Sequence, residues 1–143
     1  MTPIQWNTIV ANMAVTSQPV GLWTPVFEYL SAGTLVRVIA DGVWSYSSQM
    51  PDCGPDGHRI SFIPPQRCLA KDAQVGALIC KVGGGTADLK GTIIPGGSLC
   101  MFTIPDGGGG LFMTINDEIG GFDDNSGQLT VSVSVRLTGA ASP

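Results

Sequence analysis

Apolar and polar residues alternate strictly over residues 128–137, near the C-terminal end of the chain. The apolar members of this alternation are Leu129, Val131, Val133, Val135 and Leu137. Successive side chains of a β-strand point to opposite faces, so the pattern predicts a strand with one buried and one solvated face. Helical periodicity is almost absent elsewhere in the sequence. The hydrophobic pattern therefore predicts an all-β protein.

Further strands are expected where short, apolar runs stand between glycine-rich breaks. The breaks lie at 83–85, 95–97 and 106–110. The expected strands cover 4–14, 34–40, 77–82, 99–104 and 111–115. Many short strands joined by such turns favour a β-sandwich or jelly roll, here as a single domain over 1–143.

Composition narrows the class of protein. The chain has 143 residues, of which 43% are hydrophobic and 13% charged, and this suits one folded domain with its own core. The formal net charge is -4, and the seven basic residues are scattered singly. We therefore expect no nucleic-acid partner, because binding to a phosphate backbone needs a basic patch. We also expect no membrane insertion, because no apolar run approaches the roughly 20 residues that span a bilayer.

The N-terminal residues and the cysteines bear on location and redox state. Residues 1–6 lack the basic and apolar regions of a signal peptide, so we expect a cytoplasmic protein, or one released or surface-associated without a cleaved signal. The four cysteines have no CxxC spacing and His58 is the single histidine, which argues against a zinc site. Reduced, mostly buried thiols are expected, with two disulfides as the alternative in an exported protein.

Two segments, 41–67 and 116–127, are longer than ordinary connections, and long ordered loops are often functional. The second holds four of the eleven acidic residues, namely Asp117, Glu118, Asp123 and Asp124. Close carboxylates repel one another unless a cation joins them. Ca²⁺ takes about six to eight oxygen ligands and suits this loop, whose spacing is not that of an EF-hand. The alternative is a solvated turn, because Asp, Asn, Gly and Ser also favour turns.

Several short motifs follow one another along the chain, namely Trp6 with 10–12, the turn 42–46, the Gly-Pro-x-Gly at 54–57, Gln66, the blocks 72–78 and 81–83, and the loop and strand from 115 onward. The order of these motifs resembles the PA-IL type of bacterial lectin, a family that is calcium-dependent and binds galactose. The resemblance covers nearly the whole chain, with small insertions near Ser61 and within 21–30.

This resemblance implies a jelly-roll β-sandwich, galactose-binding-domain-like, that forms a homotetramer with one Ca²⁺ and one sugar per subunit. The implied partners are galactose-type glycans on glycoconjugates. The calcium ligands would be the backbone carbonyls of Tyr46 and Gly121 and the side chains of Asp117, Asp124 and Asn125. Two sugar hydroxyls, O3 and O4 of galactose in the family, would complete the shell.

The resemblance also implies the residues that contact the sugar. Gln66 corresponds to a residue that contacts the exocyclic hydroxymethyl group, and Glu118 lines the rim. Tyr46 would place its ring beside the apolar sugar face. The metal ligands Asp117, Gly121 and Asp124 would also contact the sugar.

The chain departs from the family pattern at three positions. Asp124 stands where the family has Asn and adds a negative charge, and Gly121 replaces a bulkier residue. Ile63 stands where the family has a histidine three residues before the glutamine, and His58 in the same loop is the candidate substitute. These departures bear on the O6 contact and on the preference for galactose.

The sequence leaves three functions open. A non-enzymatic lectin is expected first. A small glycosidase would use Asp117 with Asp123 or Asp124, but these carboxylates sit on one turn instead of flanking a cleft. A structural or adhesion module would use Ca²⁺ only to stiffen the loop. Core or subunit packing is expected to be the role of Trp6, Trp23 and Trp44.

Overall fold

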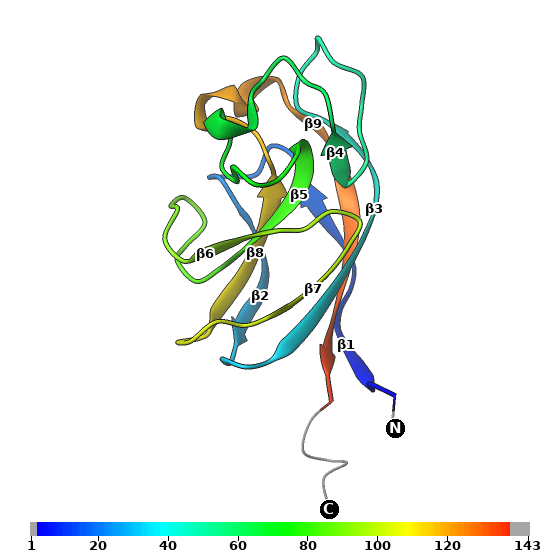
Figure 1. The fold of residues 1–143 in the computed structure, drawn as a ribbon, viewed down its shortest axis with the longest axis vertical. Helices are drawn as coiled ribbons and strands as arrows, with labels where there is room; N and C mark the ends of the chain where they lie inside the picture. Colours follow the sequence, from blue (N-terminus) through cyan, green and yellow to red (C-terminus); the bar gives the residue numbers. More distant parts are fainter. Residues whose placement is uncertain (1–2, 138–143) are drawn as a thin grey trace, which may run out of the picture.

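The computed structural model describes residues 3–137, which form two antiparallel β-sheets packed face to face (Figure 1). One sheet has the strand order β1-β9-β3-β7, and the other has the order β2-β8-β5-β4 with β6 also paired to β5. The strands are β1 (Trp6–Thr16), β2 (Thr24–Leu30), β3 (Leu35–Ser45), β4 (Asp56–His58), β5 (Val75–Val82), β6 (Thr92–Pro95), β7 (Leu99–Thr103), β8 (Gly109–Ile115) and β9 (Ser126–Arg136).

The connectivity is that of a jelly roll. Without the three-residue β4, the sheets read β1-β9-β3-β7 and β2-β8-β5-β6, so the chain crosses repeatedly between the two sheets. Each sheet then pairs strands from the two halves of the chain, as two nested Greek keys do. The expected all-β, jelly-roll sandwich is confirmed.

The alternating segment near the C-terminus forms β9, in the middle of its sheet between β1 and β3. Leu129, Val131 and Val133 are 0% exposed and face the opposite sheet within one hydrophobic core. Leu137 lies just beyond the strand and is half exposed. The alternation thus identified both the strand and its buried face, as period-two patterns do.

Three strands were not predicted from the pattern, namely β2, β4 and β6. β2 begins with Thr24-Pro25 and lies at a sheet edge, and its register with β8 shifts after Pro25. Proline lacks an N–H donor and is tolerated at such edges, but within a sequence it argues against a strand, so the pattern did not predict β2. β6 likewise ends in a proline, Pro95, and β4 is only three residues long.

The expected strand at 34–40 is longer in the structure, because β3 continues to Ser45. Residues 42–45, expected to be a turn, are therefore paired with β9, and Trp44 also forms a bridge with Cys53. This corrects the expectation that a long loop begins at residue 41. Trp44 is 1% exposed and its indole Nε1–H donates to the Gly76 carbonyl at 2.8 Å.

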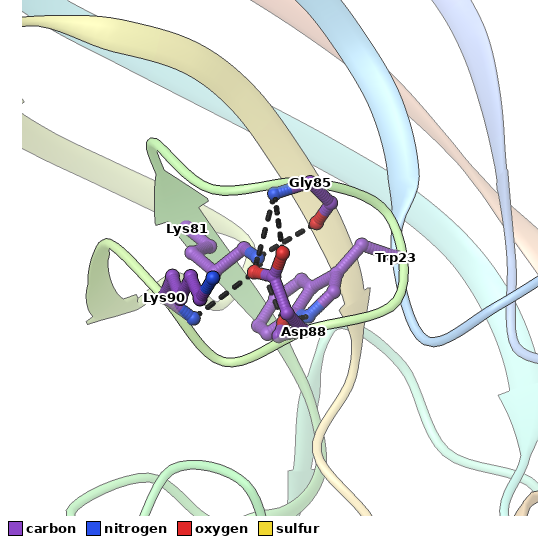
Figure 2. A network of polar contacts seen from close by, with 5 residues as sticks. All are labelled: Trp23, Lys81, Gly85, Asp88 and Lys90. Carbon is purple, nitrogen blue, oxygen red and sulfur yellow. Dashed lines mark hydrogen bonds and ion pairs between the residues drawn. The ribbon is translucent and has the colours of Figure 1, made fainter.

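β5 is buried on both faces. One face packs in the main core, and the other carries Ile79 into a second, smaller cluster with Trp23 and Ala70. Lys81 on this outer face is 0% exposed, and its Nζ donates to the Gly85 carbonyl and to both the carbonyl and the Oδ1 of Asp88 (Figure 2). A buried ammonium needs such partners, and these bonds tie the β5–β6 loop to the sheet.

The remaining tryptophan and the cysteines also fit packing roles. Trp6 is half-buried, with the guanidinium of Arg37 stacked 4.5 Å from its ring. The cysteines are free thiols, of which Cys53, Cys68 and Cys80 are buried and Cys100 is partly buried. Mostly buried thiols were expected, whereas their redox state in solution stays a prediction.

Helical structure within residues 3–137 is limited to two 3₁₀ helices, η1 (Pro65–Arg67) and η2 (Ile119–Asp124). They lie side by side at one end of the sandwich, away from the start of β1 and the end of β9 (Figure 1). Within that described range, no helix has the length and apolar character to cross a membrane.

Candidate functional site

A small cavity of about 140 Å³ opens at the end of the sandwich that carries η1 and η2. Five residues singled out from the sequence line it together, namely Tyr46, Asp117, Glu118, Gly121 and Asp124. The wall is completed by Ser47, Phe62 and Ile63. Ser47 and Phe62 were not expected at the site, whereas Ile63 was noted in the sequence as standing where the family has a histidine. Segments that follow β3 and β8, far apart in the sequence, thus meet at one site.

Asp117 is positioned by the residue before it. The buried Asn116 side chain accepts a hydrogen bond from the Ala70 N–H at 2.8 Å and donates to the Ala70 carbonyl at 2.9 Å. The Asp117 carbonyl in turn accepts from the Leu69 N–H at 3.1 Å. The end of β8 is therefore tied to the segment that follows η1, and Asp117 has a fixed backbone. Sequence reasoning missed this anchor, because one asparagine in a polar loop carries no signal of it.

The Asp117 carboxylate is buried without a balancing charge. Asp117 is 0% exposed, and its Oδ1 accepts a hydrogen bond from the Glu118 N–H at 2.7 Å. The buried Oδ2 has no hydrogen-bond partner among the described residues. Burial raises the pKa of Asp117 to about 6, although the Glu118 N–H and the Asn125 side chain act in the opposite direction. Such a carboxylate requires either a proton or a cation.

Asn125, at the end of η2, has a similar unpaired oxygen. The residue is 5% exposed, and its Nδ2 donates to the Ser17 carbonyl at 3.0 Å. This bond fixes the amide orientation, and the buried Oδ1 then has no partner in residues 3–137. Native proteins rarely leave buried acceptors unpaired, so each of these two oxygens needs an explanation.

The backbone of η2 is held by a residue from the other end of the chain. The Gln18 Nε2 donates to the carbonyls of Phe122 at 3.1 Å and Asp123 at 2.9 Å. A Cβ on Gly121 would lie 3.2 Å from the Asp117 Oδ1, so glycine gives this carboxylate room. Gln18 was not predicted, since its partners are more than a hundred residues away in the sequence.

Tyr46 lines the cavity but is only 1% exposed. Its hydroxyl is 2.8 Å from the His58 Nδ1 and donates to the Ser61 Oγ at 2.9 Å. Burial raises the pKa of the Tyr46 hydroxyl. The ring therefore has almost no face free for stacking on a sugar, which corrects that expectation. What remains to Tyr46 at the site is its backbone.

Two expected sugar contacts lie outside this cavity. Gln66 is exposed on η1 and is absent from the lining; its carbonyl accepts from the Lys71 Nζ at 3.0 Å. His58 is also absent from this lining, and its Nδ1 is engaged with Tyr46. Ile63, where the family has histidine, is 6% exposed and forms an apolar wall. At the rim, the exposed Arg67 forms an ion pair with Glu118.

The donor set suits a hard divalent cation. The side chains of Asp117, Asp124 and Asn125 and the backbone carbonyls of Tyr46 and Gly121 are all oxygen donors, the kind that calcium takes. Within residues 3–137, no three His, Cys, Asp or Glu side chains lie close enough to hold a metal by themselves. A cation here would therefore depend on amide and backbone oxygens as well as on carboxylates. The two buried oxygens without partners fit such a role.

Comparisons with known proteins bear on the fold and the family of the chain. Eight chains of known structure match, among them the EclA N-terminal domain, a PllA-like lectin. That match has a TM-score of 0.67 and 20% sequence identity, and it covers 92% of this chain and 98% of the other. At this identity the likeness establishes the fold. No protein of curated function matches the chain. The sequence profile of the PA-IL-like protein family matches residues 8–137, and the chain therefore belongs to the PA-IL-like family.

Proposed function

We propose that the protein is a non-catalytic, calcium-dependent lectin that binds galactose or a related sugar at the terminus of a glycan. One observation carries this proposal. Two side-chain oxygens, Asp117 Oδ2 and Asn125 Oδ1, are buried without a partner in the described chain, beside a small cavity lined by further acidic residues. The membership in the PA-IL-like family agrees with it.

The residues that would hold Ca²⁺ are Asp117, Asp124 and Asn125 through their side chains, and Tyr46 and Gly121 through their carbonyls. When bound, the ion would supply a centre of positive charge that accepts two neighbouring sugar hydroxyls in place of water. O3 and O4 of galactose are such a pair. A fixed pair of hydroxyls selects sugars by the geometry of their vicinal diol.

The protein's own groups would then orient the sugar. The carboxylates of Asp117 and Asp124 line the cavity and can accept hydrogen bonds from the same hydroxyls, and bonds to charged acceptors are the stronger kind. Glu118 lies at the rim, where Arg67 already neutralises part of its charge. Phe62 and Ile63 would meet the less polar side of the ring.

Preference among sugars depends on contacts around the exocyclic group. Gln66 is exposed outside the cavity and His58 is bonded to Tyr46, so neither provides a ready contact to O6 in this arrangement. We therefore propose galactose as the first sugar to test, with specificity that is broader than a dedicated O6 contact would give. A homotetramer would compensate for weak single sites by avidity on glycosylated surfaces.

A calorimetric titration of methyl galactoside and of other methyl glycosides tests the proposal. Wild-type protein is expected to release heat in calcium and none in chelator. The Asp117→Asn variant keeps the shape of the side chain but loses its charge, and we expect it to lose sugar binding. Asp106→Asn, at an exposed turn far from the site, is the matched control and should bind like the wild type. Unchanged binding in chelator would refute the mechanism.

The same two oxygens also support a module in which an ion only stiffens the loop. That function predicts a calcium-dependent rise in melting temperature together with no heat from any sugar. A glycosidase is less well supported, because Asp123 does not line the cavity and because Asp117, just before η2, and Asp124, at its end, belong to one short segment instead of flanking a cleft. Release of the aryl group from aryl glycosides by wild-type protein, absent in Asp117→Asn, would favour the enzyme instead.

A further inference from the structure

A second and larger cavity, of about 480 Å³, adjoins the small one and shares Ile63 as a wall. It is lined by the residues after β4 and by those that precede β5. We propose that this larger cavity binds a second sugar residue, joined to the one held in the small cavity, so that the natural ligand is an oligosaccharide. The inference rests on the proposed function and names the ligand class of the same site.

Size supports a ligand larger than one sugar. Pockets for small molecules usually measure about 300 to 1,000 Å³. The small cavity, at about 140 Å³, lies below that range, and the adjoining one, at about 480 Å³, lies within it. A terminal sugar on the small site would therefore be only partly enclosed, and the next residue of a glycan would have a ready-made place beyond Ile63.

The wall of the larger cavity offers both donors and acceptors. Arg59 and Lys71 donate, Asp72 accepts, and Ser61 and Gln74 do both. The ion pairs found in the described chain are Arg67–Glu118 and Lys81–Asp88, so the charges of Arg59, Lys71 and Asp72 are not used up in pairs there. Sugar hydroxyls donate and accept equally. Arg59 and Lys71 outnumber Asp72, so the wall offers more charged donors than charged acceptors, and the oxygens of sugar hydroxyls can accept from these donors.

The cavity wall is also held in place before any ligand arrives. The Gln74 Nε2 donates to the Asp56 carbonyl at 2.7 Å, and the Asn116 Nδ2 donates to the carbonyls of Ala73 and Gln74, each at 3.2 Å. On the opposite side, His58 and Ser61 are bonded to the Tyr46 hydroxyl. A preorganised wall loses less conformational freedom on binding, which favours affinity.

Comparing methyl galactoside with galactose-terminated oligosaccharides that differ in their second sugar tests this inference. We expect at least one oligosaccharide to bind about tenfold more tightly, which corresponds to one or two added hydrogen bonds. In the double variant Lys71→Ala/Asp72→Ala, the affinity for that oligosaccharide is expected to fall to the affinity of the wild type for methyl galactoside. Its affinity for methyl galactoside should not change. Lys90→Ala/Asp106→Ala, which changes the same residue class at exposed sites elsewhere, should retain the gain.

The outcomes separate the two proposals. Equal affinity for every oligosaccharide and methyl galactoside, or a gain that survives in Lys71→Ala/Asp72→Ala, would overturn the second site and leave the calcium site intact. Loss of calcium-dependent binding to all saccharides would overturn the proposed function itself. Asp117→Asn is expected to abolish binding of both ligand sizes, whereas the double variant removes only the gain.

Discussion

Asp117 and Asn125 stand at opposite ends of η2, and each keeps one buried side-chain oxygen without a hydrogen-bond partner in the described chain. The other atoms of both groups are committed: Asp117 Oδ1 accepts from the Glu118 N–H, and Asn125 Nδ2 donates to the Ser17 carbonyl. Their orientations are thus fixed by the protein while one acceptor on each remains available. This arrangement is the physical basis for a cation at the end of the sandwich.

Calcium should stabilise the folded protein. A ligand that binds only the native state adds about 2.7 kcal/mol when its concentration is 100 times its dissociation constant. We expect the melting temperature to rise with calcium in the wild type and to be insensitive to calcium in Asn125→Ala, which removes one ligand. Differential scanning calorimetry at several calcium concentrations measures this. An equal rise in both proteins would place the ion elsewhere.

Removing Arg67 should strengthen calcium binding. Its side chain is 62% exposed and pairs with Glu118 at the rim, so the Arg67→Ala variant leaves the site more negative without opening the core. Exposed charge pairs are worth roughly 0.2 to 1 kcal/mol, which corresponds to an affinity gain of up to about fivefold. Calcium titration at low and high salt tests this, because salt should diminish the effect. Arg136→Ala, away from the site, serves as the control, and weaker calcium binding in Arg67→Ala would contradict the account.

Gly76 should be required for the packing of Tyr46. Its φ is +85°, and a Cβ there would lie 2.7 Å from both Tyr46 Cδ1 and Cys53 Sγ. We expect Gly76→Ala to destabilise the protein by about 3 kcal/mol, from left-handed strain of 1 to 2 kcal/mol together with overpacking. Gly33 has a similar φ of +86° with no atom within 4 Å, so Gly33→Ala should show the strain alone. If urea denaturation shows that Gly76→Ala and Gly33→Ala lower the free energy of unfolding by the same amount, the contact with Tyr46 is unimportant.

The ion pair of Asp88 with Lys81 should make stability depend on pH at the acid end. The hydrogen bond from Lys81 lowers the pKa of Asp88 to about 2, whereas the pKa of an Asp in the unfolded chain is about 3.9. Because the folded pKa is the lower one, the stabilisation is present above pH 4 and disappears as pH falls through 2. The stability difference between wild type and Asp88→Asn should therefore shrink between pH 4 and pH 2, as followed by chemical denaturation. A difference that stays constant over this range would contradict the pairing.

Much of the fold could be predicted from the sequence because several strands carry a clear apolar alternation or a short apolar run. The alternation that ends at Leu137 gives β9 and its buried face, and the apolar run at 77–82 gives most of β5. β2 escaped prediction because Pro25 interrupts its pattern, and the end of β3 escaped because Gly42 and Ser45 read as turn residues. Pairing with neighbouring strands decides such segments, and local propensity does not report it.

The candidate site was predicted in its acidic part and not in its supports. Asp117, Glu118 and Asp124 were marked by their clustering, and the structure places all three around one cavity. The backbone bonds from Gln18 and the anchoring by Asn116 join residues distant in sequence, so a single sequence holds no trace of them. The burial of Tyr46 and the outward position of Gln66 also depend on tertiary packing.

The proposed calcium and sugar site can be examined in a crystal structure of the protein soaked with calcium and methyl galactoside, with the ion located by anomalous scattering. We expect a calcium ion about 2.3 to 2.6 Å from both Asp117 Oδ2 and Asn125 Oδ1, with two sugar hydroxyls among its other ligands. An ion bound elsewhere, or these two oxygens paired with protein N–H groups while the sugar binds at another surface, would refute the proposed site.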